Sequence, residues 1–167
     1  TKVLVLAGNP RERVDSFRFY CNESVATTKQ GVAAIEALKA QGAEVTVIAP
    51  AAAKLKIDGV KMIDHLPDGA RVESAKDMLA MAEAVQENQS VDAVMQFAGI
   101  SSIACDKPSA SKIQKTGPNK DQLFDVVGNV DVASQLQNIF ADTPMAGFTQ
   151  HQQWFAQGGD NVTSAIQ

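Results

Sequence analysis

Short apolar runs separated by polar segments recur along the chain and predict a series of buried strands. The strongest runs lie at residues 2–7, 44–49 and 91–97. Continuous apolar runs of this length are typical of strands that are buried on both faces of a parallel sheet. Weaker runs predict further strands near residues 60–63, 123–127 and 144–149.

Apolar residues with helical spacing lie between these runs. The first such stretch predicts a helix with Thr27 or Thr28 as its N-cap, running to about Gln41. Gly42 supplies the left-handed residue on which helices commonly end. Because the run at residues 44–49 follows directly, this part of the chain is expected to form a strand–helix–strand unit.

Two more helices are predicted downstream. Ser74 and Asp77 have the spacing of a capping box and predict the start of a helix that ends near Asn88, and residues 130–140 predict another. The alternation of strands and helices indicates an α/β protein with a Rossmann-like three-layer fold, in which helices flank a mainly parallel sheet. In such sheets, ligands bind at the carboxyl ends of the strands.

The composition fits one domain of ordinary globular character. The chain has 167 residues, of which 45% are hydrophobic and 20% charged. We expect residues 1–150 to form the domain and residues 151–167 a tail of uncertain structure. The net charge of −4 argues against nucleic acid as a partner, because non-specific binding needs a basic surface. A phosphate group would therefore have to be bound by a local site.

The apolar run at the N-terminus is too short for a signal peptide or a membrane span, so we expect a cytoplasmic protein without a membrane partner. Cys21 and Cys105 lie far apart and form no metal-binding motif, so neither a disulfide nor a zinc site is expected. A catalytic role for Cys21 is an alternative, but neither His65 nor His151 is near it in sequence.

The segment from residue 8 to residue 22 is more charged than a simple connection would be. Its charged side chains are Arg11, Glu12, Arg13, Asp15 and Arg18. Because the segment leaves the carboxyl end of a predicted strand, it is a candidate site for an anion. An alternative is that these charges brace the segment as ion pairs, Arg11 with Glu12 and Asp15 with Arg18. The chain has neither the GxGxxG fingerprint after this strand nor a Walker A loop.

This segment resembles the signature of the phosphopantothenoylcysteine synthetase family, also called phosphopantothenate-cysteine ligase. The matching signature residues are Arg11, Glu12, Asp15, Arg18, Phe19 and Asn22. Further along, Lys112 to Gln114 resembles the family's lysine motif, residues 127–131 its Lys-Asn-Pro-Asp segment and residues 146–148 its Gly-Phe turn. The resemblance covers about residues 2–150, with the motifs in the family's order.

The resemblance implies a ligase that uses ATP or CTP with Mg²⁺. Such an enzyme activates the carboxylate of 4′-phosphopantothenate, or a similar phosphorylated carboxylic acid, as an acyl-nucleotide, which the amine of cysteine then attacks in coenzyme A biosynthesis. The implied catalytic residues are Asn22, which would hydrogen-bond the acyl carbonyl, and Lys112, which would neutralise the α-phosphate or the acyl oxygen. The residues implied for nucleotide binding are Gly8, Arg11, Ser24, Thr28, Lys29, Ser101, Gly147 and Phe148. The family also implies a homodimer, or a second chain that completes the site.

Other interpretations stay open. Lys112 in a polar loop is ordinarily a solvated side chain, and Asn22 is ordinarily a turn or cap residue. After Asn22, the family continues with Ser-Ser-Gly-Lys-Met-Gly, whereas residues 23–31 form a longer segment with an added acid. The alternatives are therefore a catalytically degenerate domain that binds a nucleotide or a phosphorylated ligand, or a small flavin- or NAD(P)-dependent reductase.

Overall fold

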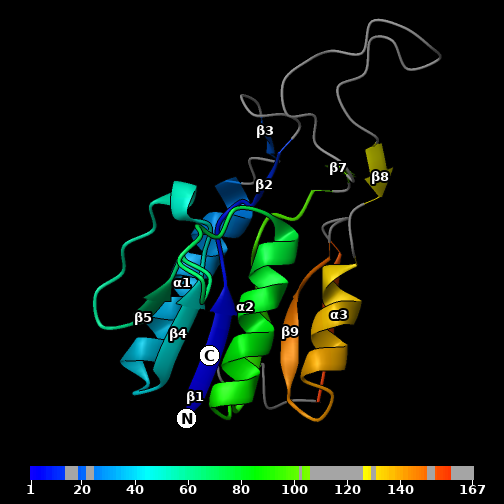
Figure 1. Ribbon diagram of the computed structural model, residues 1–167. Helices are drawn as coiled ribbons and strands as arrows, with labels where there is room; N and C mark the ends of the chain where they lie inside the picture. The colour runs from blue at the N-terminus through cyan, green and yellow to red at the C-terminus, as the bar shows by residue number, and fades with distance from the viewer. Residues whose placement is uncertain are drawn as a thin grey trace, which may run out of the picture.

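The fold is a six-stranded sheet covered by helices on both faces (Figure 1). The computed structural model describes residues 1–13, 19–21, 25–101, 103–105, 126–128, 131–149 and 153–158. The strand order is β10-β9-β6-β1-β4-β5, and β10 is antiparallel to β9 while the other pairs are parallel. The strands are β1 (Lys2–Leu6), β4 (Glu44–Ile48), β5 (Lys61–Ile63), β6 (Ala93–Gln96), β9 (Met145–Phe148) and β10 (Trp154–Gln157). The predicted fold class is confirmed.

Alternation along the central strand divides the core into two layers. Leu4 and Leu6 face α2 (Ala75–Asn88) and α3 (Val132–Ile139), which lie side by side on one face of the sheet (Figure 1). Val3 and Val5 face α1 (Val25–Ala40) on the other face. Because successive side chains of a strand point to opposite faces, a continuous apolar run was the correct signal for a strand that is buried on both faces.

The helix ends only partly follow the predicted caps. Ser74 is the N-cap of α2 and forms the predicted capping box with Asp77. Gly42, with φ of 83°, has the left-handed conformation expected after α1. The prediction that Thr27 or Thr28 caps α1 is wrong, because the helix begins at Val25 and both threonines lie inside its first turns. Threonine is favoured at caps but is also tolerated within a helix, so the sequence alone did not fix the boundary.

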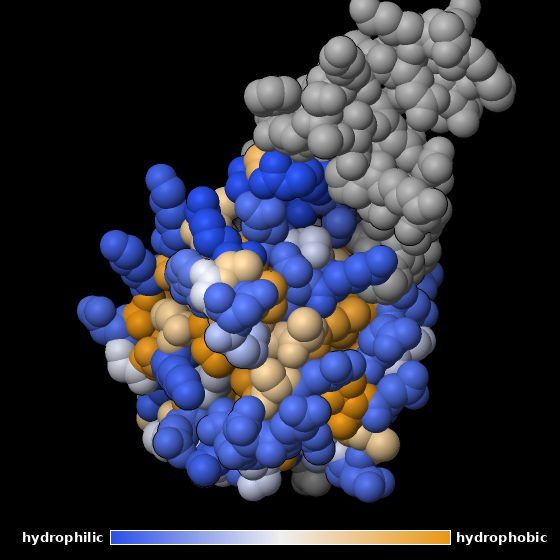
Figure 2. Space-filling model, viewed as in Figure 1, coloured by the Kyte–Doolittle hydropathy of each residue, from blue (hydrophilic) through white to orange (hydrophobic). Residues whose placement is uncertain are grey.

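The charged segment after β1 is not a plain loop. β2 (Arg11–Arg13) and β3 (Phe19–Cys21) pair antiparallel as a separate two-stranded sheet, and β7 (Ile103–Cys105) pairs with β8 (Val126–Gly128) in another. The strand predicted over residues 123–127 overlaps β8, and its first three residues lie outside the described part of the chain. Figure 2 shows strongly hydrophilic side chains where β2 lies in Figure 1.

The order of the strands places a crevice at the carboxyl end of β1. From β1 the chain crosses to β4 and β5 on one side, and then returns to β6 and β9 on the other side. The connections after β1 and β6 therefore leave in opposite directions, which is the topological switch point at which open α/β sheets bind ligands.

Candidate functional site

A pocket of about 600 Å³ lies beside the carboxyl end of β1. Its walls come from the turn after β1, the β2–β3 hairpin, the N-terminal turns of α1 and the short 3-10 helix η1 (Ala51–Ala53) that follows β4. The lining residues are Gly8, Asn9, Arg11, Cys21, Thr28, Lys29, Ala52, Ala53 and Leu55. The volume is in the range of small-molecule sites, and the position is the one that the strand order predicts.

Two smaller hollows lie elsewhere on the molecule. One of about 290 Å³ lies between β5 and α2, and one of about 340 Å³ is lined by residues of β1, β4 and β5 together with Gln89 and Val91. Neither is lined by a residue that the sequence suggested for a site. The pocket beside β1 is therefore the candidate functional site.

The pocket combines a cationic side with an apolar side. Arg11 and Lys29 contribute positive charge, and none of the lining residues that the structure describes is a carboxylate. Ala52, Ala53 and Leu55 form the apolar side. The first amide groups of α1 add to the positive potential, because the N–H groups of a helix's first turn have no acceptor within the helix. This lining suits a ligand that carries an anionic group and an apolar part.

Arg11 and Arg13 share an aromatic partner but differ in charge compensation. Their guanidinium carbons lie 3.8 Å and 4.3 Å from the centroid of the Phe19 ring. Arg13 pairs with Glu73, with 3.4 Å between its Nη2 and both carboxylate oxygens. Within the described part of the chain, Arg11 has no ion pair, and its buried Nε has no hydrogen-bond partner. Of the two arginines of β2, Arg11 is therefore the one that an anion in the pocket would neutralise.

The alternative that Arg11 pairs with Glu12 is wrong. Neighbouring residues of a strand point to opposite faces, and the Glu12 side chain is turned away from the pocket. Glu12 is 8% exposed, and its Oε1 accepts a hydrogen bond of 3.2 Å from the backbone N–H of Ala75 at the start of α2. The other suggested pair, Asp15 with Arg18, lies outside the described residues.

Gly8 shapes the pocket through its backbone. Its φ of +89° lies in the left-handed region, which favours glycine. A Cβ atom here would also lie 3.0 Å from Cδ of Pro50 and 3.1 Å from Cβ of Ala53. The turn after β1 thus approaches η1 more closely than a larger residue would allow.

Thr28 and Lys29 bring α1 to the pocket. Asn9 Nδ2 donates to Thr28 Oγ1 at 3.5 Å, across the junction between the turn after β1 and the helix. The Lys29 side chain is exposed, so its ammonium group can reach an anion at the pocket mouth.

The remaining described candidates lie further along the same edge of the sheet and do not line this pocket. Ser101 is buried after β6, and Gly147 and Phe148 are at the end of β9. The Phe148 ring lies 6.3 Å from the ring of Phe97 and 5.1 Å, edge-on, from that of Trp154. In the sheet, β6 lies between β1 and β9. The ends of β6 and β9 therefore continue the edge that begins at the end of β1.

A buried glutamine of β6 links the loop after β6 to the end of β9, which together form a second part of this edge. Gln96 is fully buried, and its Nε2 donates to the carbonyl oxygens of Ala98, at 3.0 Å, and Phe148, at 3.2 Å. Its Oε1 accepts from the backbone N–H of Ala98 at 3.0 Å. Gly147 is needed beside it, because a Cβ atom there would lie 2.5 Å from Cβ of Gln96 and would meet its carbonyl oxygen.

Of the candidates from the sequence, the structure brings Gly8, Arg11, Thr28 and Lys29 together in one pocket. Both implied catalytic residues, Asn22 and Lys112, and also Ser24, fall outside the described residues. The sequence did not suggest Asn9 or the apolar wall of the pocket. The Asn-Pro pair at residues 9–10 is a turn signal that pointed to this position, whereas small apolar residues give no chemical signal.

Among the described residues, no helix is long and apolar enough to span a bilayer. The same residues contain no group of three or more His, Cys, Asp or Glu side chains that could hold a metal ion.

Comparison with known proteins gives one family and one curated relative. The model of the family described as "DNA/pantothenate metabolism flavoprotein C-terminal domain" matches residues 1–162. The coenzyme A biosynthesis bifunctional protein CoaBC of Mycolicibacterium smegmatis is 30% identical over 161 residues. That match covers 95% of this chain but 36% of the relative, so the chain spans about a third of the relative's length.

Solved structures share the fold. The C-terminal domain of a coenzyme A biosynthesis bifunctional protein CoaBC has a TM-score of 0.57 at 19% identity, with 95% of this chain and 86% of that chain covered. A DNA/pantothenate metabolism flavoprotein from Streptococcus pneumoniae has a TM-score of 0.62 at 16% identity, covering 86% and 67%. A Cab2 mutant in complex with phosphopantothenate-cysteine has a TM-score of 0.59 at 10% identity, covering 97% and 82%.

Proposed function

Because the chain belongs to the family of the DNA/pantothenate metabolism flavoprotein C-terminal domain, we propose that it acts as a phosphopantothenate-cysteine ligase in coenzyme A biosynthesis. Two comparisons favour this activity: the curated relative is named a coenzyme A biosynthesis protein, and one structural neighbour was solved in complex with phosphopantothenate-cysteine. The structural observation that carries the proposal is the Arg11 guanidinium, which has no ion pair with any described residue, in a pocket at the switch point of the sheet. Such a pocket suits the phosphates of a nucleotide.

The proposed reaction has two steps. A carboxylate oxygen of the phosphorylated acid attacks the α-phosphorus of ATP or CTP, and the bond to the β-phosphate breaks, so that pyrophosphate leaves and an acyl-nucleotide forms. The amine of cysteine then attacks the acyl carbon, loses a proton and expels the nucleoside monophosphate, which gives the amide. Both steps build negative charge on oxygen atoms, and preorganised cations and N–H donors stabilise it.

In this proposal, the pocket beside β1 holds the phosphates. Arg11 and Lys29 supply the positive charge, and the Thr28 hydroxyl and the first N–H groups of α1 supply hydrogen-bond donors. Gly8 allows the phosphates to approach the backbone, because it presents no Cβ atom. The two cationic side chains among the described lining residues favour an anion over a cation as the ligand.

The second part of the edge is assigned to the rest of the nucleotide. The Phe148 ring offers a surface on which a base stacks, Gly147 precedes it in β9 opposite Gln96, and Ser101 follows β6 in the chain. Gln96 supports this assignment, because it holds the end of β9 and the loop after β6 in a fixed relation.

Asn22 and Lys112 stay proposals that rest on the resemblance. Asn22 follows Cys21, which lines the pocket, and this adjacency supports a role for the Asn22 amide at the acyl carbonyl. Lys112 is assigned to the α-phosphate or the acyl oxygen, as a point charge.

We assign Mg²⁺ to the substrate and not to a site built by the protein. Mg²⁺ is commonly bound through nucleotide phosphates with few protein ligands. The charged groups among the described lining residues are cations, so in this proposal the ion arrives bound to the nucleotide.

The test is release of pyrophosphate by the purified chain supplied with 4′-phosphopantothenate, cysteine, Mg²⁺ and either ATP or CTP. We expect release with at least one nucleotide, and its loss in Lys112→Ala. Lys76→Ala, which removes an exposed lysine of α2, is the matched control and should release pyrophosphate at the wild-type rate. No release above the Lys112→Ala background with either nucleotide would overturn the proposal.

A further inference from the structure

We propose that Glu12 is a positioning residue that fixes the β2–β3 hairpin on the start of α2 and thereby holds Arg11 in the pocket. The inference rests on the proposed function only in taking Arg11 as the group that meets the anion. Glu12 itself does not line the pocket. It acts through the hairpin, and its role is therefore separate from binding or chemistry.

The hairpin needs an external support. Among the strands that the structure describes, β2 and β3 pair only with each other, over Arg11 to Arg13 and Phe19 to Cys21, and neither joins the main sheet. Two-stranded hairpins of this size are marginally stable on their own in water. The position of Arg11 therefore depends on the contacts that the hairpin makes with the rest of the molecule.

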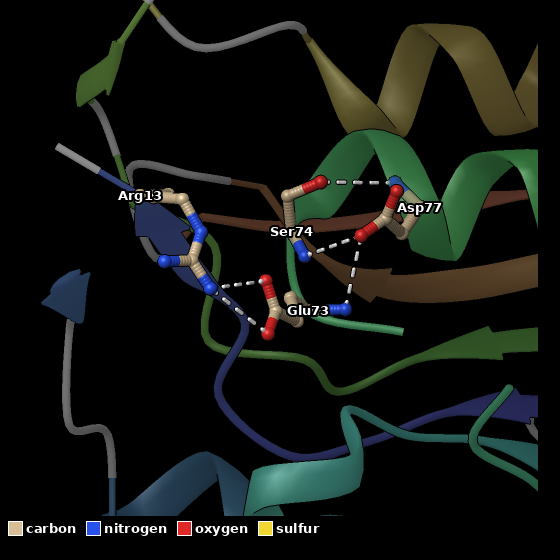
Figure 3. A network of polar contacts seen from close by, with 4 residues as sticks. All are labelled: Arg13, Glu73, Ser74 and Asp77. Carbon is tan, nitrogen blue, oxygen red and sulfur yellow. Dashed lines mark hydrogen bonds and ion pairs between the residues drawn. The ribbon is translucent and has the colours of Figure 1, made fainter. Parts of the chain in front are cut away.

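Besides its contact with β7, β2 makes hydrogen bonds to the segment at the start of α2. The backbone N–H of Arg11 donates to the carbonyl oxygen of Glu73 at 2.7 Å, and Glu12 Oε1 accepts from the N–H of Ala75 at 3.2 Å. Arg13 reaches the Glu73 carboxylate at 3.4 Å (Figure 3). All three residues of β2 are thus attached to the same short segment.

That segment is itself held in place. Asp77 Oδ2 accepts from the backbone N–H groups of Glu73, at 3.0 Å, and Ser74, at 3.1 Å, while Ser74 Oγ accepts from the N–H of Asp77 at 3.1 Å (Figure 3). The segment also reaches the opposite wall of the pocket, because the N–H of Ala51 donates to the carbonyl oxygen of Val72 at 2.9 Å. Residues 72–75 therefore join the hairpin wall to the η1 wall.

Of the two side-chain contacts between β2 and this segment, we expect the Glu12 contact to be the stronger. The Arg13–Glu73 pair is solvated, with side chains 39% and 25% exposed, and such pairs contribute little. Glu12 is 8% exposed, and its carboxylate binds an N–H at the positive end of a helix. Because strand side chains alternate, anchoring Glu12 on α2 turns Arg11 towards Phe19 and the pocket.

The experiment uses Cys21 as a probe, because it is the cross-strand partner of Arg11 and lines the same pocket. The rate of its alkylation by the anion iodoacetate is divided by the rate with neutral iodoacetamide, with both rates measured by mass spectrometry of the Cys21 peptide. A nearby guanidinium raises this ratio. Arg11→Ala should lower the ratio about threefold, the effect of a unit charge at roughly 6 Å in water.

Glu12→Ala should lower the ratio by a similar factor, and should lower it no further when Arg11→Ala is already present. Glu12→Gln keeps an acceptor for the Ala75 N–H and should restore most of the ratio. Glu87→Ala, at an exposed position near the end of α2, is the matched control and should leave the ratio unchanged.

A second variant covers the case in which Glu12→Ala does not fold. Ala75 is the first residue of α2, where proline is well tolerated, and the extended conformation of Ser74, with ψ of 171°, is compatible with a following proline. Ala75→Pro removes the N–H that Glu12 accepts and should lower the ratio as Glu12→Ala does.

A wild-type ratio in Glu12→Ala or in Ala75→Pro, or a further decrease on top of Arg11→Ala, would overturn the inference. The measurement requires neither a nucleotide nor turnover, so its failure is distinct from failure of the proposed ligase activity.

Discussion

The backbone N–H of Gly99 donates to the carbonyl oxygen of Gly8 at 2.9 Å, which ties the loop after β6 to the turn after β1. β1 and β6 are neighbouring strands, and the connections that follow them run to opposite sides of the sheet. The hydrogen bond therefore joins the two connections that open the crevice. Substitutions along this edge of the sheet should fall into two groups. Some should weaken ligand binding, and the others should lower the free energy of unfolding.

Arg11→Ala should weaken binding of the nucleotide without unfolding the protein. A hydrogen bond to a charged group contributes about 1.5–3 kcal/mol, so the dissociation constant should rise about tenfold or more. Arg13→Ala is the matched control, because the charge of Arg13 is already compensated by Glu73. Calorimetric titration with ATP and with CTP in the presence of Mg²⁺ measures both. An equal loss of nucleotide affinity in the two variants would show that Arg11 makes no specific contact with the nucleotide.

Gly147→Ala should destabilise the fold, because the new Cβ atom would meet the backbone of Gln96 in the neighbouring strand. Overpacking of this kind costs about 1–3 kcal/mol of the free energy of unfolding. Gly31→Ala provides the contrast. Its Cβ would lie 3.1 Å from a side-chain atom of Phe97, and alanine is favoured by about 1 kcal/mol within a helix. Urea denaturation compares the two, and an equal or greater loss in Gly31→Ala would be inconsistent with the backbone contact at Gly147.

Gln96→Leu should lower the free energy of unfolding by about 1–3 kcal/mol for each polar group that is left buried without a partner. The N–H of Ala98 and the carbonyl oxygen of Phe148 each lose the bond to Gln96, whereas the carbonyl oxygen of Ala98 keeps its bond of 3.0 Å from the Ile100 N–H. Gln86→Leu, on the exposed side of α2, is the control and should change stability little. Thermal unfolding followed by circular dichroism measures the difference. A Gln96→Leu protein as stable as the control would mean that this network contributes nothing.

Ser74→Ala should remove the N-cap of α2 and cost about 1 kcal/mol. The same variant should also loosen the segment on which the hairpin rests, so the amide of Arg11 should exchange its hydrogen faster. Ser90→Ala, at an exposed position after α2, is the control. Hydrogen exchange read by mass spectrometry tests this prediction, which fails if exchange in β2 is the same in both variants.

The main sheet was predictable because β1, β4 and β6 are buried on both faces and therefore appear as continuous apolar runs. β10 was missed because Trp154 to Gln157 mixes exposed and half-buried residues at the edge of the sheet. The β2–β3 hairpin was missed for a related reason. Its strands have three residues each, and neither the charged β2 nor the uncharged β3 shows the apolar alternation by which a strand is recognised.

The family was identified correctly through the resemblance of residues 8–22, and of motifs further along, to the phosphopantothenoylcysteine synthetase signature. The pocket was only partly predictable. Gly8, Arg11, Thr28 and Lys29 were suggested by the sequence, but their convergence depends on how the hairpin and α1 pack around β1. The apolar wall at residues 52–55 comes from a segment that is distant in sequence and has no distinctive composition.

The ligase proposal states that the carboxylate of the acid bonds to the α-phosphorus of the nucleotide, and an isotope tests this bond directly. The chain is supplied with Mg²⁺, ATP or CTP, cysteine and 4′-phosphopantothenate that carries oxygen-18 in its carboxylate, and the products are analysed by mass spectrometry. We predict that the nucleoside monophosphate acquires one labelled oxygen and that pyrophosphate acquires none. Label in inorganic phosphate, or amide formation with an unlabelled nucleoside monophosphate, would contradict an acyl-nucleotide intermediate.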